Sequence, residues 1–156
     1  MASSNMSVCE TCRLIENRNA GAAPLWDSIV RTDNFDVVHA FNTSLPGWII
    51  LVVRRHIAAI DELELAEAIE LGQLIRSVSI QLKKILDCRK TYVMQFAEQP
   101  GHSHVHFHVV PRMQDLASDS LGTKIFNYLG VDEDDRVDEA TMNEIAAKLR
   151  DGIGSA

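Results

Sequence analysis

Hydrophobic residues follow a strand-like pattern in the first third of the chain and again around residue 100. Short apolar or alternating runs that end at turn residues, such as Pro46-Gly47, predict β-strands. The five expected strands are residues 27–33, 35–42, 47–55, 91–98 and 103–110. The third run is apolar along nearly its whole length, so we expect it at the centre of a sheet with both faces covered.

Between Asp61 and Asp87 the pattern becomes helical. Apolar residues recur there every three or four positions, which predicts one long amphipathic helix. Asp61 with Glu64 is expected to cap its start. A short element at 124–130 and a final helix around 138–150 follow. Because strands flank one long helix instead of alternating with helices, we predict an α+β fold: an antiparallel sheet of about five strands with one long helix and a C-terminal helix.

The length of 156 residues is enough for one domain with a core of its own, and we expect a single domain over residues 1–156. Residues 1–8 are small and polar and are expected to be disordered, and residues 17–27 are expected to form a loop. The longest purely apolar run, 48–53, is far shorter than the roughly 20 residues of a membrane-spanning helix. No membrane partner is therefore expected.

The charge balance narrows the classes of ligand. A net charge of −7 disfavours binding of duplex nucleic acid, which needs a broad basic surface. A small anionic ligand remains compatible, because a few arginines and backbone N–H groups can hold a phosphate. The N-terminal stretch lacks the apolar core of a signal peptide, so we expect a cytoplasmic protein with reduced cysteines.

Histidines are concentrated in one alternating stretch. Four of the six are His102, His104, His106 and His108. Residues two apart in a strand point the same way, so the last three are expected on one face, while the apolar residues between them face the core. His102 follows Pro100-Gly101 and is expected at the surface, outside the strand.

Such a strand face has three possible interpretations. It could be a solvated surface that happens to be rich in imidazoles. It could be a metal site, because a His-x-His pair can direct two rings at one Zn²⁺. It could also carry a nucleophilic histidine, since neutral imidazole forms covalent intermediates and neighbouring rings can orient it and donate hydrogen bonds to developing negative charge.

A second candidate site is the Cys-x-x-Cys pair of Cys9 and Cys12. This spacing lets one short turn aim both sulfurs at a single Zn²⁺, whereas a redox dithiol needs a thioredoxin-like context that is not evident here. A structural zinc site needs two further ligands. His56, after the apolar strand, and His104 are the candidates. His39 lies in an apolar strand and is expected to be a buried core histidine.

The stretch His104–Val110, HVHFHVV, resembles the defining motif of the histidine triad superfamily of nucleotide hydrolases and transferases. The preceding stretch 40–57, AFNTSLPGWIILVVRRHI, resembles the family's segment with an Asn, a Pro-Gly, an apolar strand and a basic-His pair. The resemblance covers roughly residues 9–112 and leaves 113–156 as a C-terminal extension. It implies the α+β fold expected above and a homodimer.

The resemblance also implies roles for single residues. His106 is expected to attack the α-phosphorus of a nucleotide and to carry a nucleotidyl-histidine intermediate, and His108 is expected to hydrogen-bond a non-bridging phosphate oxygen. Gln95 and Ser103 resemble polar residues near the phosphates, and Asn42 resembles an amide on the ribose side. The implied partner is a purine nucleotide or a nucleotide conjugate such as a dinucleoside polyphosphate or a phosphoramidate.

A zinc-containing subset of the superfamily, including the galactose uridylyltransferase branch and small bacterial members, resembles the cysteine arrangement. Carried over, the resemblance implies a structural Zn²⁺ held by Cys9, Cys12, His56 and His104. His106 would then stay free of metal.

Two departures from the pattern keep other functions open. Many members have a histidine directly after Pro-Gly, where this chain has Trp48, which could stack on a base or pack under the sheet. The connection Gly101-His102-Ser103 before the triad is also shorter than usual. One alternative is a zinc-dependent hydrolase in which His104 and His106 bind a catalytic metal. The other is a nucleotide-binding module without turnover, in which Trp48 blocks the reaction.

Overall fold

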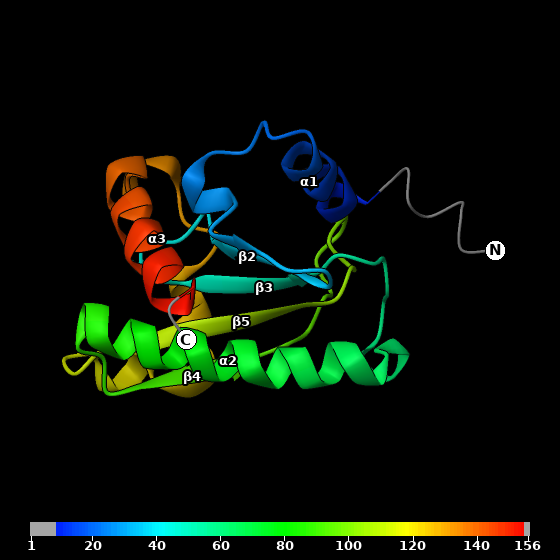
Figure 1. Cartoon of the computed structure of the whole chain (residues 1–156). Coiled ribbons are helices and arrows are strands. Elements are labelled where there is room, and N and C mark those ends of the chain that lie inside the picture. The colour runs from blue at the N-terminus through cyan, green and yellow to red at the C-terminus, as the bar shows by residue number, and fades with distance from the viewer. Residues whose placement is uncertain (1–8, 155–156) are drawn as a thin grey trace.

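A computed structural model describes residues 9–154 and shows an α+β fold built on one five-stranded sheet (Figure 1). All neighbouring strands are antiparallel, in the order β1-β2-β3-β5-β4. The strands are β1 (Val30–Arg31), β2 (Phe35–His39), β3 (Ile49–Val53), β4 (Lys90–Met94) and β5 (His106–Arg112). The α-helices are α1 (Glu10–Asn19), α2 (Leu65–Leu86) and α3 (Glu139–Gly154). The predicted fold class, with one long helix and a C-terminal helix, is confirmed.

Helices α2 and α3 cover one face of the sheet, and this is where the main core forms. Leu74 and Val78 of α2 and Leu149 of α3 pack there against the apolar residues of β3 and β5. On the opposite face, Ile15 of α1 packs against Val38 and Val52. The central strand β3 is thus covered on both sides, as its apolar sequence predicts.

The C-terminal extension folds back onto the same sheet. A 3₁₀ helix, Gly122–Tyr128, packs Ile125 into a second cluster with Trp48 and Val110. Thr43 forms an isolated β-bridge with Leu129, so the chain around 129 is fastened beside the loop after β2. The extension therefore packs on both faces of the sheet, with this 3₁₀ segment on the histidine side and α3 on the other.

Several expected boundaries are wrong. The strand pairing is shorter than the apolar runs suggest, because β1 has only two residues, β2 ends at His39 and β4 ends at Met94. The triad strand starts at His106, not at residue 103, so His104 lies in the connection before it.

The triad strand β5 also continues through Pro111. Its pairing with β3 stops at Val109, so from there on β5 pairs with β4 alone, and proline is tolerated at such an edge.

The long helix begins at Leu65 and not at Asp61, because residues 60–62 form a separate 3₁₀ turn. Its N-cap is Glu64, and the Glu67 carboxylate accepts the Glu64 backbone N–H (2.8 Å) in a capping arrangement. The last helix extends to Gly154, four residues past the expected end at 150. The expected short element near 124–130 is the 3₁₀ helix of the extension.

Helix α1 is not among the expected elements, and its last three residues lie in the expected loop 17–27, which also contains a 3₁₀ helix at Leu25–Asp27. Cys9 is its N-cap, and the sulfur accepts the backbone N–H of Cys12 (3.3 Å). The helix is mostly polar, and Leu14 and Ile15 are its only aliphatic residues, which are too few to mark a helix by recurring apolar positions. The expectation of disorder at 1–8 lies outside the described residues. Among residues 9–154, no helix is long and apolar enough to cross a membrane.

A buried ion network holds α1 on the sheet. The Arg18 guanidinium, 2% exposed, contacts the carboxylates of Asp27 (2.8 Å) and Asp36 (3.3 Å). Asp36, on β2, also binds Arg31 (2.6 Å). Burial raises the pKa of Asp27 and the neighbouring Arg18 opposes this rise. Two carboxylates inside the protein therefore depend on the Arg18 guanidinium for compensation, and Asp36 shares a second one with Arg31.

Replacing Arg18 should consequently be costly. We expect Arg18→Ala to lower the free energy of unfolding by about 3 kcal/mol, the usual cost of removing one partner of a buried ion pair. The matched control is Arg13→Ala on the same helix, whose pair with Glu10 is exposed and should contribute less than about 1 kcal/mol. Urea unfolding of both variants measures the difference, and equal losses would contradict the assignment.

Candidate active site and metal centre

His106 opens β5 with its ring fixed by the backbone. Its Nδ1 lies 2.8 Å from the carbonyl oxygen of His104, and because a carbonyl can only accept, Nδ1 carries the proton. Nε2 is then left with its lone pair. Burial, the largest cause, lowers the pKa of His106, so the ring is neutral near pH 7. A neutral imidazole with a free Nε2 is the form that attacks an electrophile.

His108 lies two residues along the same face, and its ring is 5.0 Å from that of His106, centre to centre. The indole N–H of Trp48 donates to its Nδ1 (2.9 Å), so its proton is on Nε2. Burial lowers the pKa of His108 to about 3, with a smaller contribution from His106. The two histidines are therefore complementary: His106 presents a lone pair and His108 presents an N–H donor.

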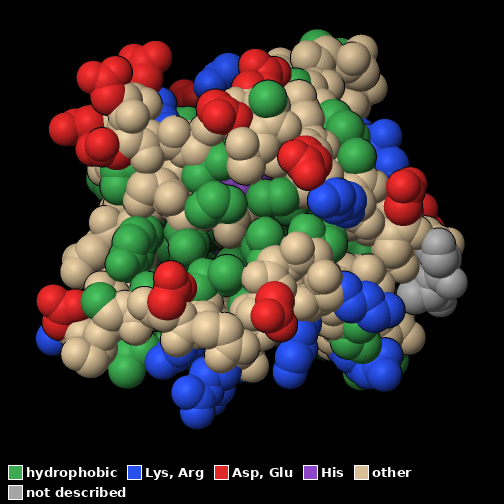
Figure 2. Space-filling view, turned by 90° about the vertical axis from the view of Figure 1, so that its left-hand side faces the viewer, with side chains coloured by type: hydrophobic (Ala, Val, Ile, Leu, Met, Phe, Trp, Pro, Cys, Tyr) green, Lys and Arg blue, Asp and Glu red, His purple; other side chains and the backbone are tan. Residues whose placement is uncertain are grey.

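Both histidines line a large cleft of about 1410 Å³ on the face of the sheet opposite α2. Its walls come from α1, the loop after β2, the loop after β4 and the C-terminal extension. Phe41 and Phe96 are about half exposed at this cleft, and Arg136 lies over the Phe41 ring (5.5 Å). Figure 2 shows hydrophobic side chains gathered around a hollow in which a histidine is visible, with acidic and basic side chains around the rim.

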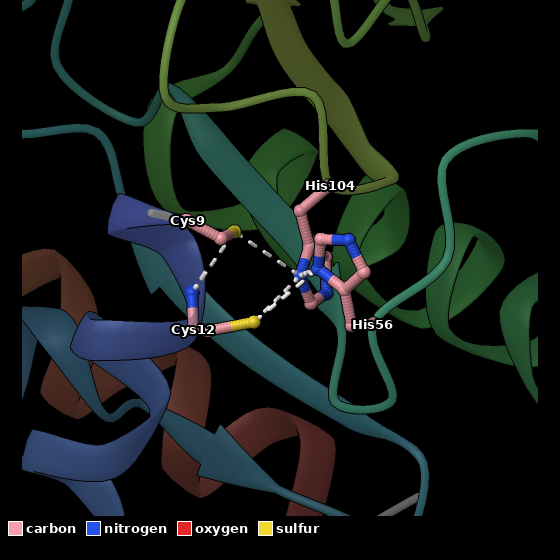
Figure 3. A group of neighbouring side chains, drawn as sticks. All are labelled: Cys9, Cys12, His56 and His104. Carbon is pink, nitrogen blue, oxygen red and sulfur yellow. Dashed lines mark hydrogen bonds between the residues drawn. The ribbon is translucent and has the colours of Figure 1, made fainter. Parts of the chain in front are cut away.

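A second cluster joins the N-terminal cap of α1 to two histidines. The side chains of Cys9, Cys12, His56 and His104 point toward one another (Figure 3). One ligand atom from each lies within 4.8 Å of all the others. The Cys12 sulfur is 3.3 Å from Nδ1 of His56 and 3.5 Å from Nδ1 of His104. The Cys9 sulfur is 3.8 Å from Nδ1 of His104, and the two Nδ1 atoms are 3.2 Å apart.

These distances fit tetrahedral coordination of one Zn²⁺ ion by the four side chains. Zn–N bonds of about 2.05 Å and Zn–S bonds of about 2.3 Å at tetrahedral angles place two nitrogens about 3.3 Å apart and a nitrogen and a sulfur about 3.6 Å apart. The measured nitrogen–nitrogen distance is 3.2 Å and the nitrogen–sulfur distances are 3.3, 3.5 and 3.8 Å. The four donors are the set that structural zinc sites use, and they leave no open position.

The surroundings of His104 also suit a ligand. Its Nε2–H donates to the carbonyl oxygen of Val53, which leaves the Nδ1 lone pair toward the cysteines. Burial lowers the pKa of His104 to about 4, so the ring is neutral. Burial first, and the neighbouring Cys9 second, raise the pKa of the Cys12 thiol to about 11, and only a bound cation would favour the thiolate here.

Solved structures with the same fold include several histidine triad proteins. A Hit-like protein involved in cell-cycle regulation from Bartonella henselae is 19% identical, with 90% of this chain and 92% of that chain covered and a TM-score of 0.66. A zinc-bound histidine triad family protein from Mycobacterium smegmatis is 16% identical over 96% of each chain, with a TM-score of 0.65. This chain has the histidine triad fold. In sequence alone, no family model and no curated protein matches it.

A third example of the histidine triad fold is a hypothetical histidine triad nucleotide-binding protein from Sulfolobus tokodaii. It is 13% identical to this chain, covers 92% of it and 93% of its own length, and has a TM-score of 0.67. These three matches extend over 90% or more of both chains, so each of them includes part of the C-terminal extension.

Of the residues expected near a ligand, only some line the cleft of this histidine triad fold. Asn42 does, and its backbone carbonyl accepts the N–H groups of Gly130 (2.9 Å) and Val131 (3.2 Å). Gln95 and Ser103 are not among the lining residues, although both lie next to segments that are. Gln95 directly follows the last residue of β4, and Ser103 is exposed in the connection before β5.

The remaining histidines have structural partners. His39 is buried, as expected: its Nδ1–H donates to the Ala40 carbonyl (2.7 Å), and its Nε2 accepts the N–H of Gly47 (2.9 Å). His102 lies outside the strand, as expected, but it is half-buried at the cleft, with its Nδ1 3.0 Å from the Thr11 hydroxyl.

Sequence reasoning did not predict the contacts of two residues that shape the site, Trp48 and Phe126. Trp48 is fully buried and is not among the residues lining the cleft, so the base-stacking interpretation is wrong. Phe126, from the C-terminal extension, lies edge-on to both Trp48 and His108, at 5.7 and 5.4 Å between ring centres. The only signal for Trp48 was its departure from the family pattern, and nothing in the sequence marked Phe126.

Proposed function

We propose that this protein is a nucleotide hydrolase or nucleotidyltransferase that acts at the α-phosphate of a nucleotide conjugate through a nucleotidyl-histidine intermediate. The substrate class is a purine dinucleoside polyphosphate or nucleoside phosphoramidate. One observation carries the proposal: beside a large cleft, a neutral histidine with a free Nε2 stands next to a second neutral histidine that presents an N–H.

In the first step, Nε2 of His106 attacks the α-phosphorus. An N–P bond forms, the bond from phosphorus to the leaving oxygen or nitrogen breaks, and the leaving group departs with a proton from solvent. The ring becomes a cation while it carries the nucleotide. The His104 carbonyl, which accepts the Nδ1–H, stabilises this positive charge, and Nε2–H of His108 donates to a non-bridging oxygen as charge develops there.

In the second step, water attacks the phosphorus of the intermediate. A P–O bond forms, the N–P bond breaks, the electron pair returns to Nε2 of His106 and the attacking water gives up a proton to solvent, which regenerates the neutral ring and releases a nucleoside monophosphate. Phosphate or another acceptor in place of water would make the same site a transferase. The adenine or guanine base and its ribose would occupy the part of the cleft that includes Phe41 and Asn42.

We further propose that Cys9, Cys12, His56 and His104 hold a structural Zn²⁺. The tetrahedral spacing of the four donors supports this. The ion would neutralise both thiolates and link α1 to the connection that leads into β5. His106 is outside the four-residue cluster, and a closed set of four protein ligands does not favour the alternative in which His104 and His106 bind a catalytic metal.

A homodimer is the third part of the proposal. Strand β4 is an edge of the sheet, and Val93 on it and Phe96 just beyond it are 44% and 56% exposed. An unpaired edge with apolar side chains favours pairing with a second chain. A second copy paired through β4 would continue the sheet and cover both side chains.

The central test is trapping of the intermediate. We expect brief incubation with adenosine 5′-phosphoramidate or diadenosine tetraphosphate, followed by an acid-free quench, to add one adenylyl group to the chain. His106→Asn should abolish this adduct and lower turnover by more than about 10³-fold, because the nucleophile is gone. Intact-mass analysis detects the adduct. A folded wild-type protein that binds AMP but never forms it would favour the binding module without turnover.

Metal content tests the zinc site independently. We expect the purified protein to contain about one zinc per chain and Cys9→Ser to lose most of it, because one of four ligands is removed. The matched control is Cys88→Ser: Cys88 is a free, buried cysteine outside the cluster, so this variant should keep its metal. Elemental analysis by mass spectrometry measures both, and equal zinc in the two variants would contradict the assignment.

The oligomeric state tests the edge strand. We expect Val93→Lys to shift the protein from dimer to monomer, because a charge on the edge opposes pairing with a second copy. Leu65→Lys is the matched control, since Leu65 is 77% exposed at the start of α2 and not on the edge strand. Light scattering after gel filtration measures the mass. A dimer that survives Val93→Lys but not Leu65→Lys would locate the interface elsewhere.

A further inference from the structure

Trp48 makes a contact that the proposed reaction does not by itself require. Its side chain is fully buried, and its indole N–H donates to Nδ1 of His108 at 2.9 Å. The Trp48 and His108 rings meet edge to face, with centres 5.7 Å apart. The Phe126 ring lies edge-on to both of them. His108 is thus enclosed by two aromatic rings and His106.

The indole N–H limits which form of His108 can exist. Indole has a donor and no acceptor, whereas an imidazole nitrogen donates or accepts according to its protonation. The contact therefore requires an unprotonated Nδ1, and the neutral ring must carry its proton on Nε2. Adding a proton to Nδ1 would break the hydrogen bond and bring two N–H groups together in a buried site, which is costly.

The groups around His108 do not compensate for a charge on it. Besides Trp48 and Phe126, its neighbours in the sheet are Ile50 on β3 and Met94 on β4. Among the described residues, the titratable group beside the ring is His106, whose own charge would repel a second one. No carboxylate is among these neighbours.

We propose that Trp48 is a positioning residue that fixes His108 as a neutral ring with its Nε2–H directed to the reacting phosphate. This inference rests on the proposed function for the role of His108, but the state of the ring is a property of the resting protein. The departure from the family pattern at Trp48 is then a functional feature: a histidine here could donate or accept, whereas tryptophan can only donate.

Heteronuclear NMR of the full-length zinc-loaded protein tests the state of the ring directly. We expect a scalar coupling across the hydrogen bond between the Trp48 indole nitrogen and Nδ1 of His108. We also expect a single tautomer of His108, with the proton on Nε2, from about pH 5 to about pH 8. The chain has two tryptophans, so Trp26→Phe assigns the Trp48 indole signal.

Two variants separate the hydrogen bond from the filled volume. Trp48→Phe keeps an aromatic ring but removes the N–H. In this variant His108 should show mixed tautomers and should become protonated at a higher pH than in the native protein. In steady state Trp48→Phe should lower kcat about tenfold with KM changed less than twofold, as expected for a contact that matters in the transition state. Trp48→His can donate again and should recover part of kcat near neutral pH, but with a new dependence on pH.

The outcomes are distinct. The inference is overturned if the native protein lacks the coupling, if His108 shows mixed tautomers or protonates near pH 6, or if Trp48→Phe leaves the His108 signals unchanged. If the native signals are as expected but no substrate turns over, the proposed function fails while the assignment of the ring stands. Since the native spectrum alone can overturn the inference, it stays testable even if both variants fold poorly.

Discussion

The hydrogen bond from Nδ1–H of His106 to the carbonyl of His104 is the contact on which the proposed chemistry depends. It fixes which nitrogen of His106 has a lone pair, and His106 is among the residues that line the cleft. The same residue, His104, uses its ring for another purpose, with Nε2 bound to Val53 and Nδ1 directed at two cysteines. Backbone and side chain of one histidine therefore serve two neighbouring sites.

Because of this arrangement, the three histidines of the triad have different hydrogen-bond partners and different roles in the proposed site. His104 lies just before the strand and belongs to the cluster of two cysteines and two histidines, His106 carries the free lone pair, and His108 carries the donor. The differences come from the second partner of each ring: the Val53 carbonyl, the His104 carbonyl and the Trp48 indole. Burial keeps all three neutral, so hydrogen bonds and not charge assign their roles.

The predictable parts of the site are those whose residues lie only two or three positions apart in the sequence. Two-residue alternation in a strand places His106 and His108 on one face, and two residues between Cys9 and Cys12 put both sulfurs at one helix start. The long helix was readable because its apolar stripe repeats over 22 residues. These patterns need only local geometry.

What could not be predicted depends on contacts between distant positions. Trp48 and His108 are 60 residues apart, and neither the partner of the indole nor the position of Phe126 follows from spacing. Helix α1 has too few apolar residues to be recognised from the sequence, and it is held by the ion pair between Arg18 and Asp36 on β2. The start of β5 at His106 was missed because HVHFH alternates from residue 104, whereas the His104 ring is directed at Cys9, Cys12 and His56.

Nitrogen NMR of the protein loaded with a spin-active cadmium isotope in place of zinc tests the central claim most directly. We expect the cadmium to couple to Nδ1 of His56 and of His104 and to leave His106 uncoupled, with a proton on Nδ1 of His106 and none on Nε2. A cadmium coupling at His106, or a proton on its Nε2 at neutral pH, would contradict the account.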